Sequence, residues 1–132
     1  NNVVVSSSPD GLTWSPPVRV TSGRNAVLPA VGAHPVSGQL ALLYYVVSDA
    51  GIDAELVESR AGSPSGRADF GAPRRLSART MRVDWLPTTV SGRMLADYVS
   101  VHYAGTRPLA VWALASEPVG VTLQQAIYAT RG

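Results

Sequence analysis

Turn-forming residues interrupt this chain so often that long helices have little room to form. Clusters with glycine, mostly joined by proline, aspartate or serine, lie at 9–11, 35–38, 49–51, 62–66, 91–92 and 104–106, and such clusters favour tight turns. None of the segments between them shows a helical stripe of apolar residues with capping residues at its ends. The spacing therefore predicts an all-β fold.

Two apolar runs, 40–47 and 108–115, stand out between these turns. Runs of this length that are bounded by turn residues are typical of strands covered on both faces. The tyrosines and valines at 44–47 favour a strand for the first run. The second run is richer in alanine, so a helix stays open there as the alternative.

Shorter segments indicate further strands. They lie at 3–7, 18–21, 30–33, 54–59, 74–77, 98–103 and 123–130. Within 98–103, Val99 and Val101 alternate with Ser100 and His102, which is the period-two pattern of a strand. Prolines stand just before 18–20 and 74–76, and proline is tolerated mainly at sheet edges, so these two segments are expected to be outer strands.

Charge and composition exclude several function classes. The chain has 132 residues, 11 arginines and no lysine, nine acidic residues and a net charge of +2, with no basic cluster of the kind that predicts nucleic-acid binding. It has no cysteine, its two histidines lie far apart, and Asp49, Asp53 and Asp84 lack the spacing of a calcium loop. No apolar stretch is long enough to span a membrane. The sequence predicts no metal, no cofactor, no nucleic-acid partner and no membrane span.

A loose internal repeat supports a modular architecture. Residues 14–21 and 70–77 each carry an aromatic residue, a proline three positions on and an Arg-aliphatic-hydroxyl ending, and 56 residues separate Pro17 from Pro73. The pairs Leu28-Pro29 and Leu86-Pro87 follow at a similar offset. A repeat of this length accommodates four short strands and their turns, which is one propeller blade.

One motif carries a family resemblance. The segment 8–14 contains Ser8, Asp10, Gly11, Thr13 and Trp14, and it resembles the Asp-box of sialidases and related six- or seven-bladed β-propellers, with one residue fewer than the commonest spacing. The carboxylate of Asp10 is expected to accept backbone N–H bonds across a hairpin turn, Gly11 to supply a permissive φ, Ser8 and Thr13 to add hydroxyl bonds, and Trp14 to pack on the sheet.

The C-terminal third extends this resemblance. Secreted bacterial sialidase-like propellers often carry Gly-Asp-Tyr where this chain has Ala96-Asp97-Tyr98. The resemblance implies a secreted protein and a partial β-propeller of about two to three four-stranded antiparallel blades. Residues 1–21 would form half a blade, 28–77 a full blade and 86–132 the last, incomplete blade. Because these blades cannot close a ring, the expected partners are other blades, from further copies or from a longer polypeptide.

The same resemblance places the ligand site in the loops at the propeller mouth, here 22–27, 49–53, 78–85 and 116–120. Sialidases clamp a sugar carboxylate with arginines and use a tyrosine nucleophile with supporting acids. By resemblance, the ligand-binding candidates are Arg24, Arg82, Asp84 and Tyr98, and the catalytic candidates are Tyr98 as nucleophile with Asp84 or Asp97 as the acid. The alternative is that the loop charges are merely solvated and that Tyr98 is an inner-strand aromatic residue.

Three functions stay open at this point. The leading interpretation is a portion of a propeller that acts in carbohydrate or protein recognition and assembly, without being catalytic by itself. The second is an exo-acting glycosidase, similar to sialidases, whose active site would be completed by other blades. The third is a purely structural all-β module such as a sandwich.

Overall fold

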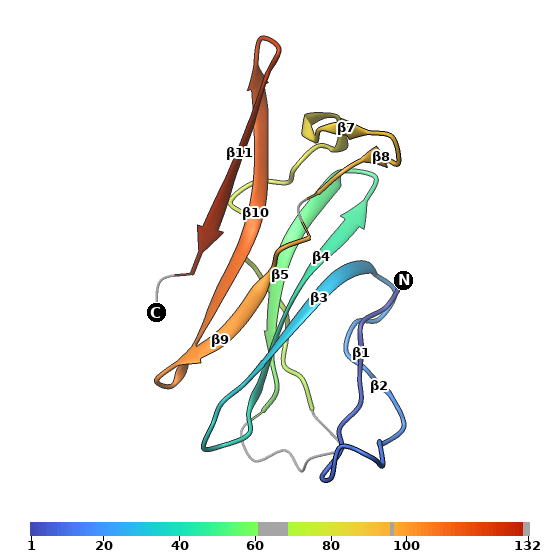
Figure 1. The fold of residues 1–132 in the computed structure, drawn as a ribbon, viewed down its shortest axis with the longest axis vertical. Helices are drawn as coiled ribbons and strands as arrows, with labels where there is room; N and C mark the ends of the chain where they lie inside the picture. Colours follow the sequence, from blue (N-terminus) through green and yellow to red (C-terminus); the bar gives the residue numbers. More distant parts are fainter. Residues whose placement is uncertain (61–68, 96, 131–132) are drawn as a thin grey trace.

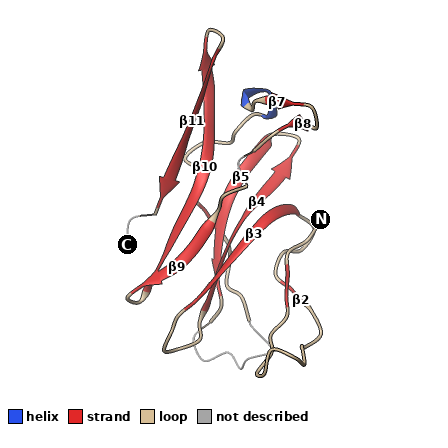
Figure 2. Ribbon diagram, in the orientation of Figure 1, coloured by secondary structure: helices blue, strands red, loops and turns tan. Residues whose placement is uncertain are grey.

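The computed structural model describes residues 1–60, 69–95 and 97–130. The turn expected at 62–66, Ala96 and the last two residues lie outside these ranges. Within them the chain is all-β and contains no α-helix, only the single 3-10 turn η1 (Val83–Trp85) (Figure 2). The described part of the chain also contains no helix of the length and apolarity that a membrane crossing requires.

The strands form several small antiparallel sheets that follow one another along the chain (Figure 1). A two-stranded sheet contains β1 (Val4–Val5) and β2 (Val18–Arg19). The four-stranded sheet contains β3 (Asn25–Ala33), β4 (Leu40–Ser48), β5 (Gly51–Glu58) and β6 (Arg74–Arg75). A short hairpin contains β7 (Thr88–Thr89) and β8 (Gly92–Arg93). The three-stranded sheet contains β9 (Ser100–Ala104), β10 (Arg107–Val119) and β11 (Thr122–Ala129).

The predicted all-β class is confirmed, and both apolar runs are strands. The helix alternative for 108–115 was wrong, because this run pairs with β9 on one side and β11 on the other. The segments expected to be outer strands, at 18–21 and 74–77, supply β2 and β6, each at the edge of its sheet. The β7–β8 hairpin was not predicted; it forms around the turn expected at 91–92.

The four-stranded sheet is covered on both faces, which explains the unbroken apolar run in β4. Alternate residues of β4 point to opposite sides. Leu42, Tyr44 and Val46 pack with Val3 and Val57 on the face towards the first sheet. The opposite face packs against the three-stranded sheet through a larger core, which contains Ala41, Leu43, Tyr45, Ile52, Leu56, Met81, Val101, Trp112 and Leu114.

The two larger sheets approach each other closely where β3 passes β9. A Cβ atom on Gly32 of β3 would overlap with the carbonyl group of Val101 in β9, so this position requires glycine. Beyond the end of β9, the edge of β10 is completed by side chains from other elements. The Tyr45 hydroxyl donates to the carbonyl oxygen of Ala113 (2.8 Å) and accepts from its N–H (3.0 Å), and the N–H of Ala115 reaches Sδ of Met81 (3.1 Å).

Two expectations require correction. Trp14 does not pack on a sheet in this chain, since 60% of its surface is exposed; the β1–β2 hairpin has only two paired residues in each strand and offers no face at that point. Tyr98 is not an inner-strand aromatic residue either, because β9 begins at Ser100 and 87% of Tyr98 is exposed. The sequence pattern predicts sheet packing for both residues, but β1 and β2 do not extend to Trp14 and β9 does not extend to Tyr98.

Candidate functional site

Three of the four loops expected at a propeller mouth gather at one end of the molecule, opposite the Asp10 hairpin (Figure 1). The turn between β4 and β5 lies against the segment that leads into η1. Ile52 and Met81 exchange main-chain hydrogen bonds of 2.8 and 2.9 Å. A Cβ atom on Gly51, whose φ is +130°, would overlap with the Met81 carbonyl oxygen, so glycine is needed for this close approach.

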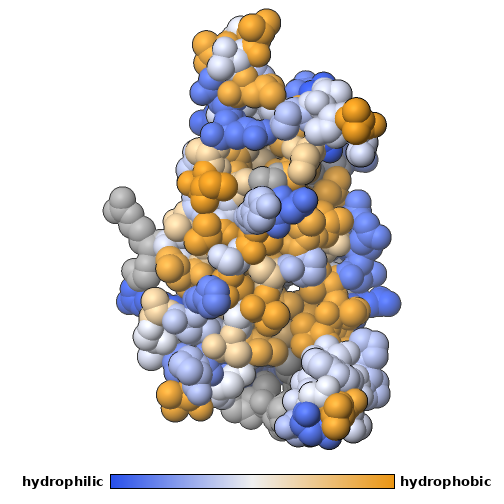
Figure 3. Space-filling model, viewed as in Figure 1, coloured by the Kyte–Doolittle hydropathy of each residue, from blue (hydrophilic) through white to orange (hydrophobic). Residues whose placement is uncertain are grey.

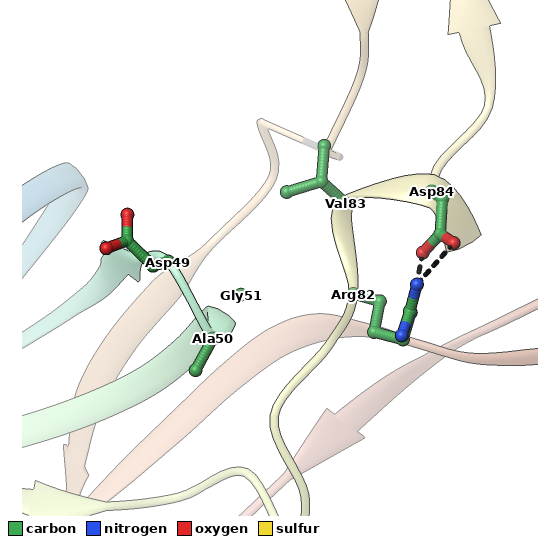
Figure 4. A pocket seen from close by; sticks show the side chains of 6 residues that line it. All are labelled: Asp49, Ala50, Gly51, Arg82, Val83 and Asp84. Atoms are coloured by element: carbon green, nitrogen blue, oxygen red, sulfur yellow. Dashed lines mark hydrogen bonds and ion pairs between the residues drawn. The ribbon is translucent and has the colours of Figure 1, made fainter.

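Next to this contact lies a charged hollow of about 360 Å³. Its lining comes from two segments that are thirty residues apart in the sequence, namely Asp49, Ala50, Gly51, Arg82, Val83 and Asp84. Figure 4 shows the guanidinium of Arg82 turned towards Asp84, with the carboxylate of Asp49 on the other side of the hollow. The hollow therefore presents two carboxylates and one guanidinium to solvent.

Arg82 and Asp84 form a two-point ion pair on the surface. Nε of Arg82 donates to Oδ1 of Asp84 (3.0 Å) and Nη2 donates to Oδ2 (2.9 Å). Hydrogen bonding to Asp84, followed by its charge and that of Glu117, raises the pKa of Arg82. Hydrogen bonding from Arg82 lowers the pKa of Asp84. The charge of Glu117, in the segment 116–120, thus acts on the site as well.

A second, larger hollow of about 560 Å³ lies on the neighbouring β7–β8 hairpin. Its lining includes Leu28, Arg93, Met94 and Asp97. Arg93 is anchored by a hydrogen bond to the Leu86 carbonyl oxygen, and its charge contributes to the lowered pKa of Asp84. Asp97, a candidate acid from the sequence, therefore faces a different hollow from the one that Asp84 lines.

Arg24 is not part of the charged hollow. It forms a two-point ion pair with Glu55 of β5, with distances of 2.8 and 2.6 Å. The Glu55 side chain is 7% exposed and that of Arg24 is 41% exposed. Glu55 lies opposite Tyr44 across β4 and β5; burial, followed by the charge of Glu55, raises the pKa of Tyr44 to about 12. The pair thus sits on the face of the four-stranded sheet that packs on β1 and β2.

The structure brings together only two of the four ligand-binding candidates, Arg82 and Asp84. Arg24 is engaged by Glu55, and Tyr98 does not line the charged hollow. Sequence reasoning missed Glu55, although an acidic residue between Ala54 and Leu56 in an apolar strand was a signal for a buried ion pair. Asp53, also expected in a mouth loop, accepts from the Ser77 hydroxyl (2.8 Å) and contacts Arg75 (2.8 Å), which ties β5 to the segment after β6.

The Asp10 hairpin lies at the far end from the charged hollow and has the local geometry predicted for it. Oδ1 of Asp10 accepts from the N–H groups of Leu12 (2.9 Å) and Thr13 (2.8 Å) and from the Ser8 hydroxyl (2.9 Å). Gly11 has a φ of +74° and donates its N–H to the Ser8 hydroxyl. The Thr13 and Leu12 N–H groups and the Ser8 hydroxyl lower the pKa of Asp10 to about 2.

Neither a metal-binding cluster among the described residues nor a similar protein assigns a function to the candidate site. Across residues 1–60, 69–95 and 97–130, no three histidine or acidic side chains converge in a way that could hold a metal ion. Comparison with protein-family models, curated proteins and solved structures finds no match to this chain. The candidate site therefore stands on its geometry alone.

Proposed function

We propose that this chain is a portion of a secreted sialidase-like β-propeller and that it recognises carbohydrate at the charged hollow. The observation that carries the proposal is a hollow at one end of the antiparallel sheets, lined by Asp49 from one loop and by the Arg82–Asp84 ion pair from another. Binding residues are commonly held on loops that a rigid β scaffold positions.

The order of the sheets supports the propeller part of the proposal. Sheets of two, four, two and three strands follow one another along the chain, and all of them are antiparallel. The first long strands of the two larger sheets, β3 and β9, are in close contact at Gly32 and Val101. A propeller is likewise built from consecutive antiparallel sheets, typically of four strands each, arranged around a central channel.

The chemistry of the hollow suits a sugar. Carboxylates accept hydrogen bonds from hydroxyl groups, while a guanidinium donates to hydroxyl or carboxylate oxygens. Arg82 uses Nε and Nη2 on Asp84, and within the described residues its Nη1 has no hydrogen-bond partner. Asp84 thus holds the guanidinium in place with donors left over for a ligand.

Recognition is favoured over hydrolysis because the residues proposed for hydrolysis lie in separate surroundings. Arg24 already binds Glu55 with both terminal nitrogens, so its fork is not open to a sugar carboxylate. Tyr98 and Asp97 belong to a different segment from the charged hollow. An exo-glycosidase would need further blades to supply the missing groups.

The test is a titration of ¹⁵N-labelled protein with sialyllactose and, separately, with lactose, followed by NMR. We expect the amide signals of Gly51, Val83 and Asp84 to shift, and those of the Asp10 hairpin to stay unchanged. Arg82→Ala should weaken binding about tenfold, because it removes a charge-assisted hydrogen bond to the sugar. A larger loss for sialyllactose than for lactose would assign the guanidinium to the sugar carboxylate.

The matched control is Arg107→Ala, which removes an exposed arginine from the β9–β10 hairpin at the other end of the sheet. Binding by this variant should equal that of the unmodified chain. If neither sugar shifts the amides around the hollow, the carbohydrate proposal is wrong. If Arg107→Ala weakens binding as much as Arg82→Ala does, the site has been placed at the wrong end.

A further inference from the structure

The strand β11 has an open edge along its whole length. It pairs with β10 from Val111↔Ala129 to Val119↔Thr122 and is the outermost strand of its sheet. Within the described part of the chain, no strand pairs with its other side. Seven of its eight residues are exposed, in contrast to the buried strands of the four-stranded sheet.

The hydrogen bonds of β10 show which main-chain groups of β11 face this edge. Thr130 donates its N–H to the Ala110 carbonyl oxygen, whereas Ala113 directs both main-chain groups to Tyr45 on the opposite side. Because direction alternates along a strand, even-numbered residues of β11 bond to β10. Unpaired N–H and C=O groups therefore face outward at four alternate positions: Leu123, Gln125, Ile127 and Ala129.

The strand β11 itself lacks the charged residues and prolines that commonly keep sheet edges apart. Natural edge strands are usually protected by charged residues, proline, bulges or a covering element. Residues 122–129 contain no charged residue, no proline and no glycine. Leu123, Ile127 and Tyr128 are 42%, 62% and 47% exposed, and the β10–β11 ribbon projects beyond the rest of the molecule, with apolar residues at its tip (Figure 3).

We propose that β11 pairs in antiparallel fashion with β11 of a second copy, around a two-fold axis at Ala126. This register places Gln125 opposite Ile127 and Leu123 opposite Ala129, so all four outward-facing positions exchange main-chain hydrogen bonds. The three-stranded sheet then becomes one continuous sheet of six strands. The interface is the same surface on both copies, which closes the assembly at a dimer.

The charge and size of the residues in β11 indicate that the strand that pairs with its open edge is β11 of a second copy. Antiparallel self-pairing places each residue of β11 opposite another residue of the same strand, and β11 carries no charge that could be repelled by the second copy. The axis coincides with a pair that is not hydrogen-bonded, where the Cα atoms approach to roughly 4.5 Å. The residue there is alanine, whose small side chain allows this approach. A charged partner strand would find no complementary charge on β11.

The dimer is tested first by light scattering and sedimentation of the unmodified chain. We expect a species of twice 13.9 kDa at micromolar concentrations. Gln125→Pro removes a donor that faces the open edge and none that bonds to β10, and proline is tolerated on such an edge. This variant should remain folded by circular dichroism and sediment as a monomer.

Disulfide trapping tests the register. The chain has no cysteine, so Ala126→Cys introduces the only thiol, and the Cα separation expected at the axis lies within the range of disulfides. Under mild oxidation this variant should form a covalent dimer. Gln124→Cys, two residues along the same strand face, should not, because the two copies of residue 124 would be roughly 13 Å apart at the rise of a strand.

Each outcome of these experiments either supports or overturns the dimer. A monomer at all concentrations overturns the proposal, as does a dimer that Gln125→Pro leaves intact. Equal trapping of Ala126→Cys and Gln124→Cys overturns the register. The proposal does not depend on the charged hollow, because sugar binding and dimerisation are measured on separate surfaces, so either can fail without the other.

Discussion

Two hairpins of similar length have opposite surroundings in this molecule. The β4–β5 hairpin is almost entirely buried, with Leu43 and Tyr45 at 0% exposure. In the β10–β11 hairpin, β10 is buried over its central part, while β11 is exposed on nearly every residue. Both hairpins are antiparallel ladders with tight turns; the β4–β5 ladder is regular, whereas the β10–β11 register shifts between Ser116 and Val119.

The difference arises from neighbours rather than from the strands themselves. β4 and β5 have β3 and β6 at their sides and a packed sheet on each face. Among the described strands β11 pairs only with β10. The ring of Tyr128 stacks on Trp112. A strand on an open edge can keep its ladder without a core, and its apolar side chains then remain available to a partner.

The two hairpins should differ most in the free energy of unfolding that is lost when an aliphatic side chain is removed from each. Leu43→Ala leaves a cavity in a close-packed core and should lower the free energy of unfolding by about 2–5 kcal/mol. The side chain of Ile127 is 62% exposed, so Ile127→Ala should change the free energy of unfolding by no more than about 0.5 kcal/mol. Urea denaturation, at concentrations dilute enough to keep the chain monomeric, measures both. Equal effects would mean that β11 is covered in the monomer.

The substitution Tyr45→Phe tests the contact between the two hairpins. This change leaves the buried N–H and carbonyl groups of Ala113 without their partner, so it should destabilise the fold by about 1–3 kcal/mol. Denaturation with urea checks the value. The matched control is Tyr98→Phe, in a tyrosine that is 87% exposed and should have an effect below about 0.5 kcal/mol. A Tyr45→Phe variant as stable as the control would show that water replaces the hydroxyl.

The smallest expected effect concerns the Asp10 hairpin, where local hydrogen bonds rather than burial hold an exposed turn. The pKa of Asp10 is lowered from 3.8 to about 2 in the folded chain, so the folded state binds this proton less tightly than the unfolded state does. The contribution of Asp10 to stability is therefore present above about pH 4 and is lost as the pH falls towards 2. Carboxyl chemical shifts from NMR measure the titration directly.

The control for this prediction is Asp10→Asn. The difference in unfolding midpoint between this variant and the unmodified chain should shrink between pH 4 and pH 2, because protonation removes the charge that the variant lacks. An Asp10 carboxyl that titrates near 3.8 would contradict the prediction. It would show that the N–H groups of Leu12 and Thr13 do not favour the charged form in solution.

Sequence reasoning located most strands because strand and turn signals are local. The glycines and prolines at the turns, and the apolar runs between them, act through nearest neighbours in the chain. The Asp10 turn was predicted for the same reason, since its donors and acceptors all lie within a few residues of one another. Local sequence patterns did not predict the exposure of Trp14 and Tyr98, because exposure depends on segments that are distant in the chain.

The site shows the same division. Arg82 and Asp84 are two residues apart and pair locally, whereas Arg24 and Glu55 are separated by thirty-one residues and meet only because β3 and β5 belong to one sheet. Asp49 reaches the hollow because the Gly51–Met81 contact holds two loops together. No periodic pattern in the chain encodes those distances.

The all-β class, the positions of the long strands and the geometry of the Asp10 turn follow from the sequence, since they depend on backbone preferences and on contacts over a few residues. The Arg24–Glu55 ion pair, the bonds from Tyr45 to the edge of β10 and the open edge of β11 among the described strands could be known only from the fold. Such contacts depend on which sheets pack together, and packing is a property of all the surfaces at once rather than of any one segment.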